Sequence, residues 1–117
     1  MGKKAITMIS RDPKKLVVFE GYMNYLSWRK GNPSSNASAL VLNSLALLQS
    51  GLEKAKAFPV IDVYLDRDPS GYTALSTWMK ALPYSTDRSE IYKGLNDYND
   101  KIIADLKRER KLQNPVR

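Results

Sequence analysis

Short apolar runs that alternate with stretches of helical spacing constrain the fold of this chain of 117 residues. The apolar runs are 16–19, 39–42 and 60–65, and the stretches with helical spacing are 22–30, 45–55 and 70–82. Runs that are apolar at nearly every position are typical of strands buried on both faces of a sheet. Strands that alternate with helices favour a parallel sheet with right-handed crossovers. The sequence therefore predicts an α/β fold of about four parallel strands flanked by helices.

The last quarter of the chain has a weaker pattern. Residues 90–92 predict a short fourth strand, and their polarity places it near an edge of the sheet. Residues 95–111 predict a closing helix, whose core-facing positions are Leu95, Tyr98, Ile102 and Leu106. No internal repeat or long linker divides the chain. We expect one domain over 1–117, with a core of about 15–106 and flexible basic ends.

The amino-acid composition excludes several kinds of chemistry. Cys and His are both absent, so disulfides, zinc ribbons and histidine catalysis are excluded. Catalysis would have to use carboxylates, Lys, Arg, Tyr, Ser or Thr, together with a hard metal ion bound through oxygen. No run approaches the roughly 18 apolar residues that a membrane span needs. Residues 1–13 lack the apolar core of a signal peptide, so we expect a cytoplasmic protein without membrane attachment.

The net charge is +7, from 19 basic and 12 acidic side chains. Such a balance favours polyanionic partners, because neutralised phosphates release condensed counterions. The basic residues gather near both ends of the chain, at Lys3, Lys4, Arg11, Lys14 and Lys15 and at Lys101, Lys107, Arg108, Arg110 and Lys111. The other interpretation is that these residues are only solvated, frayed ends.

Acidic residues follow two of the predicted strands. Glu20 comes directly after the first apolar run, and Asp66 and Asp68 come after the third. Ligands of open parallel sheets bind beyond the carboxyl ends of the strands, so the three acids are expected at one edge. Converging carboxylates repel one another unless a cation binds, and Mg²⁺ takes one or two carboxylates plus waters and phosphates. Metal-assisted phosphoryl chemistry is the natural use of such a site, and helix capping by the two aspartates is the alternative.

Two other motifs could account for the same acids. The segment 66–71 (DRDPSG) begins like an EF-hand loop, but the twelfth position is Thr77 where a Glu is needed, and a strand precedes it. A haloacid-dehalogenase-type phosphatase would place its Asp-x-Asp after the first strand instead of the third. A response-regulator receiver also carries acids after strands one and three, with Asp66 as phosphoacceptor, although here the first site has one acid and a fifth strand is missing. The receiver-like reading stays open as an alternative.

The acidic segments resemble the Toprim family, the catalytic domain shared by bacterial primases, type IA and type II topoisomerases and some nucleases. The family pattern is Glu-Gly after the first strand, here Glu20-Gly21, and Asp-x-Asp-x-x-Gly after the third, here ending at Gly71. The primase-type branch is the most similar. The matching segments are 18–24 (VFEGYMN), 81–84 (ALPY) and 94–98 (GLNDY). The resemblance covers about 15–106 and implies a compact, Rossmann-like Toprim fold.

The resemblance also implies roles for the acids. Asp66 and Asp68 would hold Mg²⁺, with Mn²⁺ as a substitute, and Glu20 would be a metal ligand or a general acid/base. Asp97 would be an accessory acid and Asn96 a polar neighbour. The chain departs from the primase pattern in one place that matters, because Asn24 stands where an Asp is usual.

The residues around the acids would contact phosphate or nucleotide. Gly21 and Gly71 would let the backbone approach a phosphate closely, although tight turns are an equal explanation for both glycines. Arg67 lies between the two aspartates, where contact with a phosphate and simple exposure to solvent are equal explanations. Tyr72, at the start of the third helix, is well placed to lie near a bound nucleotide, although its spacing with Leu75, Met79 and Leu82 also suits the core.

The resemblance therefore implies a Toprim catalytic module of a primase-like protein, with Mg²⁺-dependent nucleotidyl or phosphodiester transfer on DNA or RNA. Its partners would be nucleic acid, nucleotides and other primase domains. Primases of this kind also need a zinc-binding region and a subdomain that grips the template, so the chain alone is not expected to make primers. It would be part of a larger enzyme or a nuclease-like Toprim protein. A non-catalytic module that binds nucleic acid or protein is the main alternative, followed by the receiver-like phosphoacceptor.

Overall fold

The computed structural model describes residues 5–92, 103–104 and 106–108. Within these residues the strands form one sheet in the order β1-β3-β2-β4-β5. The strands are β1 (Thr7–Ile9), β2 (Asp12–Phe19), β3 (Ala37–Val41), β4 (Val60–Tyr64) and β5 (Thr86–Asp87). The α-helices are α1 (Tyr22–Gly31), α2 (Leu48–Ala55) and α3 (Pro69–Ala81), and the short 3₁₀ helices are η1 (Leu45–Leu47) and η2 (Ser89–Tyr92).

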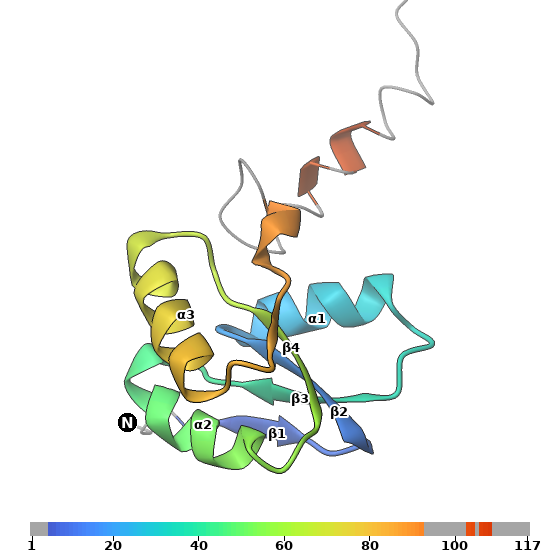
Figure 1. Ribbon diagram of the computed structural model, residues 1–117. Coiled ribbons are helices and arrows are strands. Elements are labelled where there is room, and N and C mark those ends of the chain that lie inside the picture. Colours follow the sequence, from blue (N-terminus) through green and yellow to red (C-terminus); the bar gives the residue numbers. More distant parts are fainter. Residues whose placement is uncertain (1–4, 93–102, 105, 109–117) are drawn as a thin grey trace, which may run out of the picture.

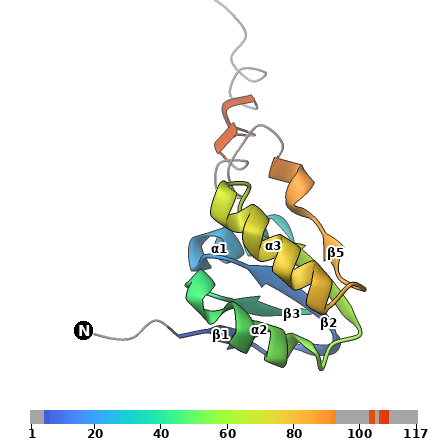
Figure 2. The same cartoon turned by 60° about the vertical axis from the view of Figure 1, so that its left-hand side comes forward.

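Strands β2 to β5 pair in parallel, and β1 pairs antiparallel with β3. Helix α1 covers one face of the sheet, and α2 and α3 cover the other (Figure 1). The view in Figure 2 brings α2 and α3 in front of the strands. The predicted α/β fold, with a parallel sheet flanked by helices, is confirmed.

The apolar runs of the strands divide their side chains between two cores. In β2, Leu16 and Val18 pack towards α2 and α3, whereas Val17 and Phe19 pack towards α1. This alternation follows from the two-residue period of a strand, and burial on both faces explains why the run is apolar throughout. The ring of Phe19 stacks on Tyr64 of β4 with centroids 5.0 Å apart. The two central strands are therefore held together just before the acidic residues begin.

The sheet begins earlier in the chain than the predicted core at residue 15. Strand β1 was not predicted, and β2 already starts at Asp12. Three half-buried residues at an edge give β1 too short a pattern to detect, and the first half of β2 is polar because it is exposed. Lys14 and Lys15 consequently lie in a strand, not in a frayed end.

The prediction of a strand at 90–92 is wrong. Ser89–Tyr92 is the 3₁₀ helix η2, and the last strand is the two-residue β5 just before it. An edge strand of two polar residues carries no apolar run for sequence reasoning to find. Leu95, Tyr98 and Ile102 of the predicted closing helix lie outside the described residues, whereas 103–104 and 106–108 are helical. Leu106 is exposed, contrary to the expectation that it faces the core.

Helix α3 packs against the core through Gly71, Ala74 and Trp78, and Leu75, Met79 and Leu82 pack there as well, as their spacing suggests. Trp78 is fully buried, and its indole nitrogen Nε1 donates a hydrogen bond to Ser85 Oγ at 3.0 Å. Gly71 and Ala74 lie on the same buried side, whereas Tyr72, whose spacing also suits the core, is 48% exposed. The large indole decides the orientation, because burying it removes more apolar surface from water than burying the tyrosine would.

Candidate metal centre

The acids of the site leave two neighbouring strands at the same edge of the sheet. Strands β2 and β4 run parallel, with Phe19 opposite Tyr64 at their last paired positions. Glu20 follows Phe19 directly, and Asp66 follows Tyr64 by two residues. This register brings together residues that are more than forty positions apart in the sequence.

One carboxylate oxygen from each of Glu20, Asp66 and Asp68 lies within 4.8 Å of the others. All three residues are half-buried, and the Oε1 atom of Glu20 is shielded from solvent. Two ligands of one Mg²⁺ ion can stand at most about 4.2 Å apart, twice the metal–oxygen distance, and Mg²⁺ usually keeps several waters. The spacing therefore fits an ion held by small side-chain movements or through one bridging water. The predicted convergence is present, and the role of these residues as ligands stays a prediction.

Asp68 is also the N-cap residue of α3. Its Oδ1 accepts a hydrogen bond of 2.7 Å from the backbone N–H of Gly71 and so caps the start of α3. Capping was the alternative explanation for the aspartates, and it is correct for this one. A carboxylate has two oxygens with several lone pairs, so a cap on Oδ1 leaves the other oxygen able to bind a cation.

Asn24 brings α1 into the site. The residue is 6% exposed, and its Nδ2 donates a hydrogen bond of 3.0 Å to Oδ1 of Asp66. The amide on α1 thus holds the carboxylate of Asp66 in place, although the two residues are 42 positions apart in the sequence. An acid at this position would bring a negative charge where the amide now brings a donor.

The two glycines of the motif stand in different surroundings. A Cβ atom on Gly71 would overlap the backbone carbonyl oxygen of Asp66, so the packing of the chain on itself requires glycine there. A Cβ atom on Gly21 would meet no described atom within 4 Å. The backbone of Gly21 has φ −122° and ψ 151°, which any residue adopts. The contribution of either glycine to phosphate binding remains a prediction.

Arg67 and Tyr72 lie beside the aspartates. The guanidinium carbon of Arg67 stands over the ring of Tyr72, 5.5 Å from its centroid. Within the described part of the chain, Arg67 forms no ion pair with either neighbouring aspartate. The guanidinium group therefore contacts the ring of Tyr72.

Sequence reasoning missed Asn43, which supports the site from the segment just after β3. Its backbone N–H donates to the carbonyl oxygen of Glu20 at 2.9 Å, and its φ is 63°. Its side-chain Nδ2 donates to the carbonyl of Ala5 and to Oγ1 of Thr7, which joins β1 to the same corner. Asn tolerates the left-handed region better than most residues, and an Asn directly after an apolar strand was the available signal.

Comparison with known proteins bears on the fold. No family model matches the chain, and no curated protein matches it. The solved primase fragment of the bacteriophage T7 primase-helicase protein is similar, with a TM-score of 0.64, 21% identity and 86% of this chain covered. So is a chain of the bacteriophage T7 assembly of lagging-strand DNA polymerase with primase domains of two gp4 subunits bound to an RNA/DNA hybrid and dTTP, with a TM-score of 0.65, 20% identity and 86% coverage.

The chain has a primase-like fold. The likeness concerns the fold, which resembles that of the two primase structures, and it does not identify a family for this chain. The matched part is 43% of the first structure and 53% of the second, so this chain spans about half the length of those proteins.

Two predicted accessory residues, Asn96 and Asp97, lie outside the described residues. None of the described helices has the length and apolar character needed to cross a membrane.

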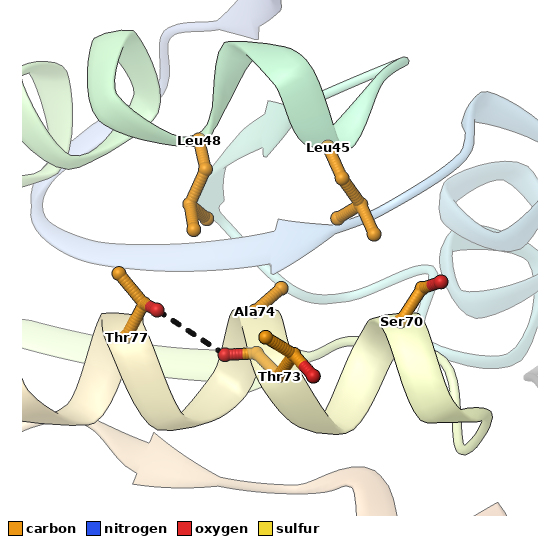
Figure 3. Close-up of a pocket in the computed structure, with 6 residues that line it drawn as sticks. All are labelled: Leu45, Leu48, Ser70, Thr73, Ala74 and Thr77. Atoms are coloured by element: carbon orange, nitrogen blue, oxygen red, sulfur yellow. Dashed lines mark hydrogen bonds between the residues drawn. The ribbon is translucent and has the colours of Figure 1, made fainter.

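A groove lies apart from the acids, between η1–α2 and α3. Its volume is about 320 Å³, and its lining combines two leucines with hydroxyl side chains and an alanine (Figure 3). The lining residues are Leu45, Leu48, Ser70, Thr73, Ala74 and Thr77. In Figure 3, Leu45 and Leu48 point towards α3, which supplies the other four residues. None of the three acids lines this groove, so it is a separate feature of the α2–α3 face.

Proposed function

We propose that this chain is the Toprim catalytic module of a primase-like protein and supports Mg²⁺-dependent nucleotidyl or phosphodiester transfer on DNA or RNA. The observation that carries the proposal is the grouping of Glu20, Asp66 and Asp68 within 4.8 Å at the carboxyl ends of two adjacent parallel strands. The primase-like fold supports it independently.

In the proposed site Asp66 and Asp68 hold the cation, for which Mn²⁺ can replace Mg²⁺. When bound, the metal neutralises negative charge on the phosphoryl group. Glu20 accepts or returns a proton at its carboxylate, the role that a half-buried acid beside a reacting phosphate can fill. Asn24 fixes the orientation of the Asp66 carboxylate through the hydrogen bond from Nδ2.

The start of α1 offers a place for a phosphate. The N-cap residue Gly21 makes no side-chain hydrogen bond to the first turn, and nothing described stands within 4 Å of where its Cβ would be. Free N–H groups at a helix N-terminus favour anions. We assign Gly21 the role of admitting a phosphate next to Glu20, and Gly71 a role in folding.

Nucleic acid and nucleotides are the proposed partners, together with further domains of a larger protein. The net charge of +7 favours polyanions. One of the similar structures contains primase domains bound to an RNA/DNA hybrid and dTTP. Because this chain spans about half of each primase structure, we expect other domains to supply the template contacts.

Metal-dependent stabilisation tests the proposal. Mg²⁺ or Mn²⁺ at millimolar concentration should raise the melting temperature, because an ion bound only to the folded chain stabilises it. The double variant Asp66→Asn with Asp68→Asn should abolish the rise. Glu53→Gln removes an exposed carboxylate elsewhere on the surface and should keep the rise. No metal effect on the unaltered chain would overturn the catalytic proposal.

A non-catalytic module that binds nucleic acid or protein is the second candidate. The observation that favours it is Asn24, an amide where an acid is expected, which lowers the negative charge available to a cation. Nucleic-acid binding that is unchanged by Mg²⁺, Mn²⁺ or the double aspartate variant would support this candidate. The receiver-like alternative gains no support from the two primase structures, and phosphorylation of Asp66 by a small phosphodonor would be needed to revive it.

A further inference from the structure

An exposed aromatic ring stands at the edge of the acidic centre. Tyr72 lies in the first turn of α3, and its backbone N–H donates to the carbonyl oxygen of Asp68 at 2.9 Å. Nearly half of the residue, 48%, is accessible to solvent. Trp78 and Ala74 lie on the core side of the helix, and Tyr72 is not among its buried residues. The ring is therefore available to a ligand that reaches the three carboxylates.

Arg67 contacts one face of the Tyr72 ring. Its guanidinium group stands 5.5 Å from the ring centroid and covers one face. The contact limits the motion of both side chains, since a cation over an aromatic face is attracted by the ring quadrupole. It also holds the planar guanidinium, with its N–H donors, against a ring in the first turn of α3, and Arg67 lies between Asp66 and Asp68 in the sequence. A second exposed ring, Tyr22, occupies the first turn of α1 beside Glu20.

We propose that Tyr72 and Arg67 form a stacking subsite for a nucleobase whose phosphate lies at the acidic centre. The inference rests on the proposed function, because the acids are what bring a phosphate to this edge. A base stacks on the exposed face of Tyr72, while Arg67 donates hydrogen bonds to the phosphate of the same nucleotide. Stacking of this kind tolerates any base, since every base has a π face. The subsite thus holds a nucleotide or a single strand by shape and charge, without reading its sequence.

Tyr84 provides a matched control. It is 49% exposed, close to the value for Tyr72, and its hydroxyl donates to the carbonyl oxygen of Phe58 at 3.1 Å. Phe58 precedes β4, so Tyr84 stands near the amino end of the strand whose carboxyl end leads to Asp66. A general effect of removing a surface tyrosine will appear at both positions, and an effect of the subsite only at Tyr72.

Fluorescence anisotropy of an end-labelled oligothymidylate, titrated with the full chain in Mg²⁺, tests the proposal. Tyr72→Ala should weaken binding by about 5- to 100-fold, the usual cost of removing one base–aromatic stack. Tyr72→Phe keeps the ring and should bind within about twofold of the unaltered chain, and Tyr84→Ala should bind as the unaltered chain does. Arg67→Gln should weaken binding and reduce the salt dependence by about one counterion. Competition with dTTP distinguishes a free nucleotide from a single strand as the ligand. If dTTP displaces the labelled strand, a mononucleotide can occupy the subsite. If dTTP does not displace it, the single strand is the ligand.

Two results would overturn the subsite. Equal affinities for Tyr72→Ala and Tyr84→Ala would show that the ring makes no stack, and a loss in Tyr72→Phe as large as in Tyr72→Ala would assign the effect to the hydroxyl. Melting temperatures of all variants, measured with and without Mn²⁺, keep this outcome distinct from failure of the metal site. If Mn²⁺ raises the melting temperature of every variant and Tyr72→Ala binds the strand as the unaltered chain does, the metal centre is supported and the subsite is wrong. If Mn²⁺ has no effect on the melting temperature and strand binding still depends on the Tyr72 ring, the stacking subsite is supported and the metal centre is wrong.

Discussion

The two strand-to-helix junctions that carry the acids are built differently. The first junction, Glu20 and Gly21 between β2 and α1, has no side-chain cap and open space where a Cβ of Gly21 would stand. The second junction, 65–68 between β4 and α3, is closed on itself: Asp68 caps the helix, and Gly71 packs against the carbonyl of Asp66. Asp68 and Gly71 at the second junction thus meet demands of folding, whereas Gly21 at the first junction meets none that the described residues impose.

This difference distinguishes motif residues that the fold itself explains from residues that the fold leaves unexplained. Two positions of the Asp-x-Asp-x-x-Gly pattern have a structural explanation without a metal, because Asp68 caps the helix and Gly71 is in close contact with the backbone. Gly21 at the first junction has no such explanation, because its φ of −122° suits any residue and a Cβ there would meet no described atom within 4 Å. Gly21 is therefore the more informative of the two glycines about function.

The largest expected effect is that of Gly71→Ala. The new methyl group overlaps the carbonyl oxygen of Asp66, so the turn must open, and the free energy of unfolding should fall by at least about 3 kcal/mol. The melting temperature should drop by roughly 10 °C or more. Gly21→Ala is the control and should change stability by at most about 1 kcal/mol, since the loss of a weak cap and the gain in chain stiffness oppose each other. Equal losses in the two variants, measured by thermal unfolding, would remove the contrast between the junctions.

The next effect concerns Asn24, which joins the two junctions through Asp66. In Asn24→Asp the donor to the carboxylate is replaced by a second carboxylate, so the metal-free protein should lose about 1–3 kcal/mol. Mn²⁺ should restore part of this loss, because a cation relieves the repulsion. Calorimetry with and without Mn²⁺ measures both quantities. A variant that is as stable as the unaltered chain without metal would show that the hydrogen bond does not position Asp66.

Asp68 allows capping and metal binding to be separated. Asp68→Asn keeps a good cap and should leave the metal-free stability within about 0.5 kcal/mol, while the stabilisation by Mn²⁺ falls. Asp68→Ala removes the cap as well and should cost about 1 kcal/mol without metal. If Asp68→Asn responds to Mn²⁺ as the unaltered chain does, Asp68 is only a cap.

The smallest effect on stability is expected from Arg67→Gln. The contact with Tyr72 is half exposed, so its loss should lower the free energy of unfolding by at most about 0.5–1 kcal/mol. Urea unfolding measures this change. A loss above that range would mean that Arg67 stabilises the second junction, and its freedom to contact a ligand would then be doubtful.

Much of the fold and part of the site could be predicted from the sequence. The runs that became β2, β3 and β4 and the helices between them follow from local periodicity and burial, which a single segment encodes by itself. The cap by Ser44 was also predictable, and its Oγ accepts from the N–H of Ala46 at 3.3 Å, although the first turn is the 3₁₀ helix η1. Strands β1 and β5 could not be predicted, because two or three partly polar residues gain strand structure only from their neighbours in the sheet.

Asp62 shows how tertiary partners override a local pattern. It sits buried inside the third apolar run, and a lone buried charge would be costly. Lys15 from β2 and Arg88 from beyond β5 each place a nitrogen 3.5 Å from its carboxylate. The two cations come from opposite sides of β4, so only the assembled sheet makes this residue tolerable.

The sequence by itself determined that acids follow two buried strands, and parallel strands place such ends at one edge. The tertiary structure decided the rest: the register of Phe19 against Tyr64 that brings Glu20 to Asp66 and Asp68, the hydrogen bond from Asn24, and the orientation of α3 that leaves Tyr72 exposed. The physical reason is that periodicity and capping act within a few residues, whereas these contacts join segments that only the packing of the whole sheet brings together.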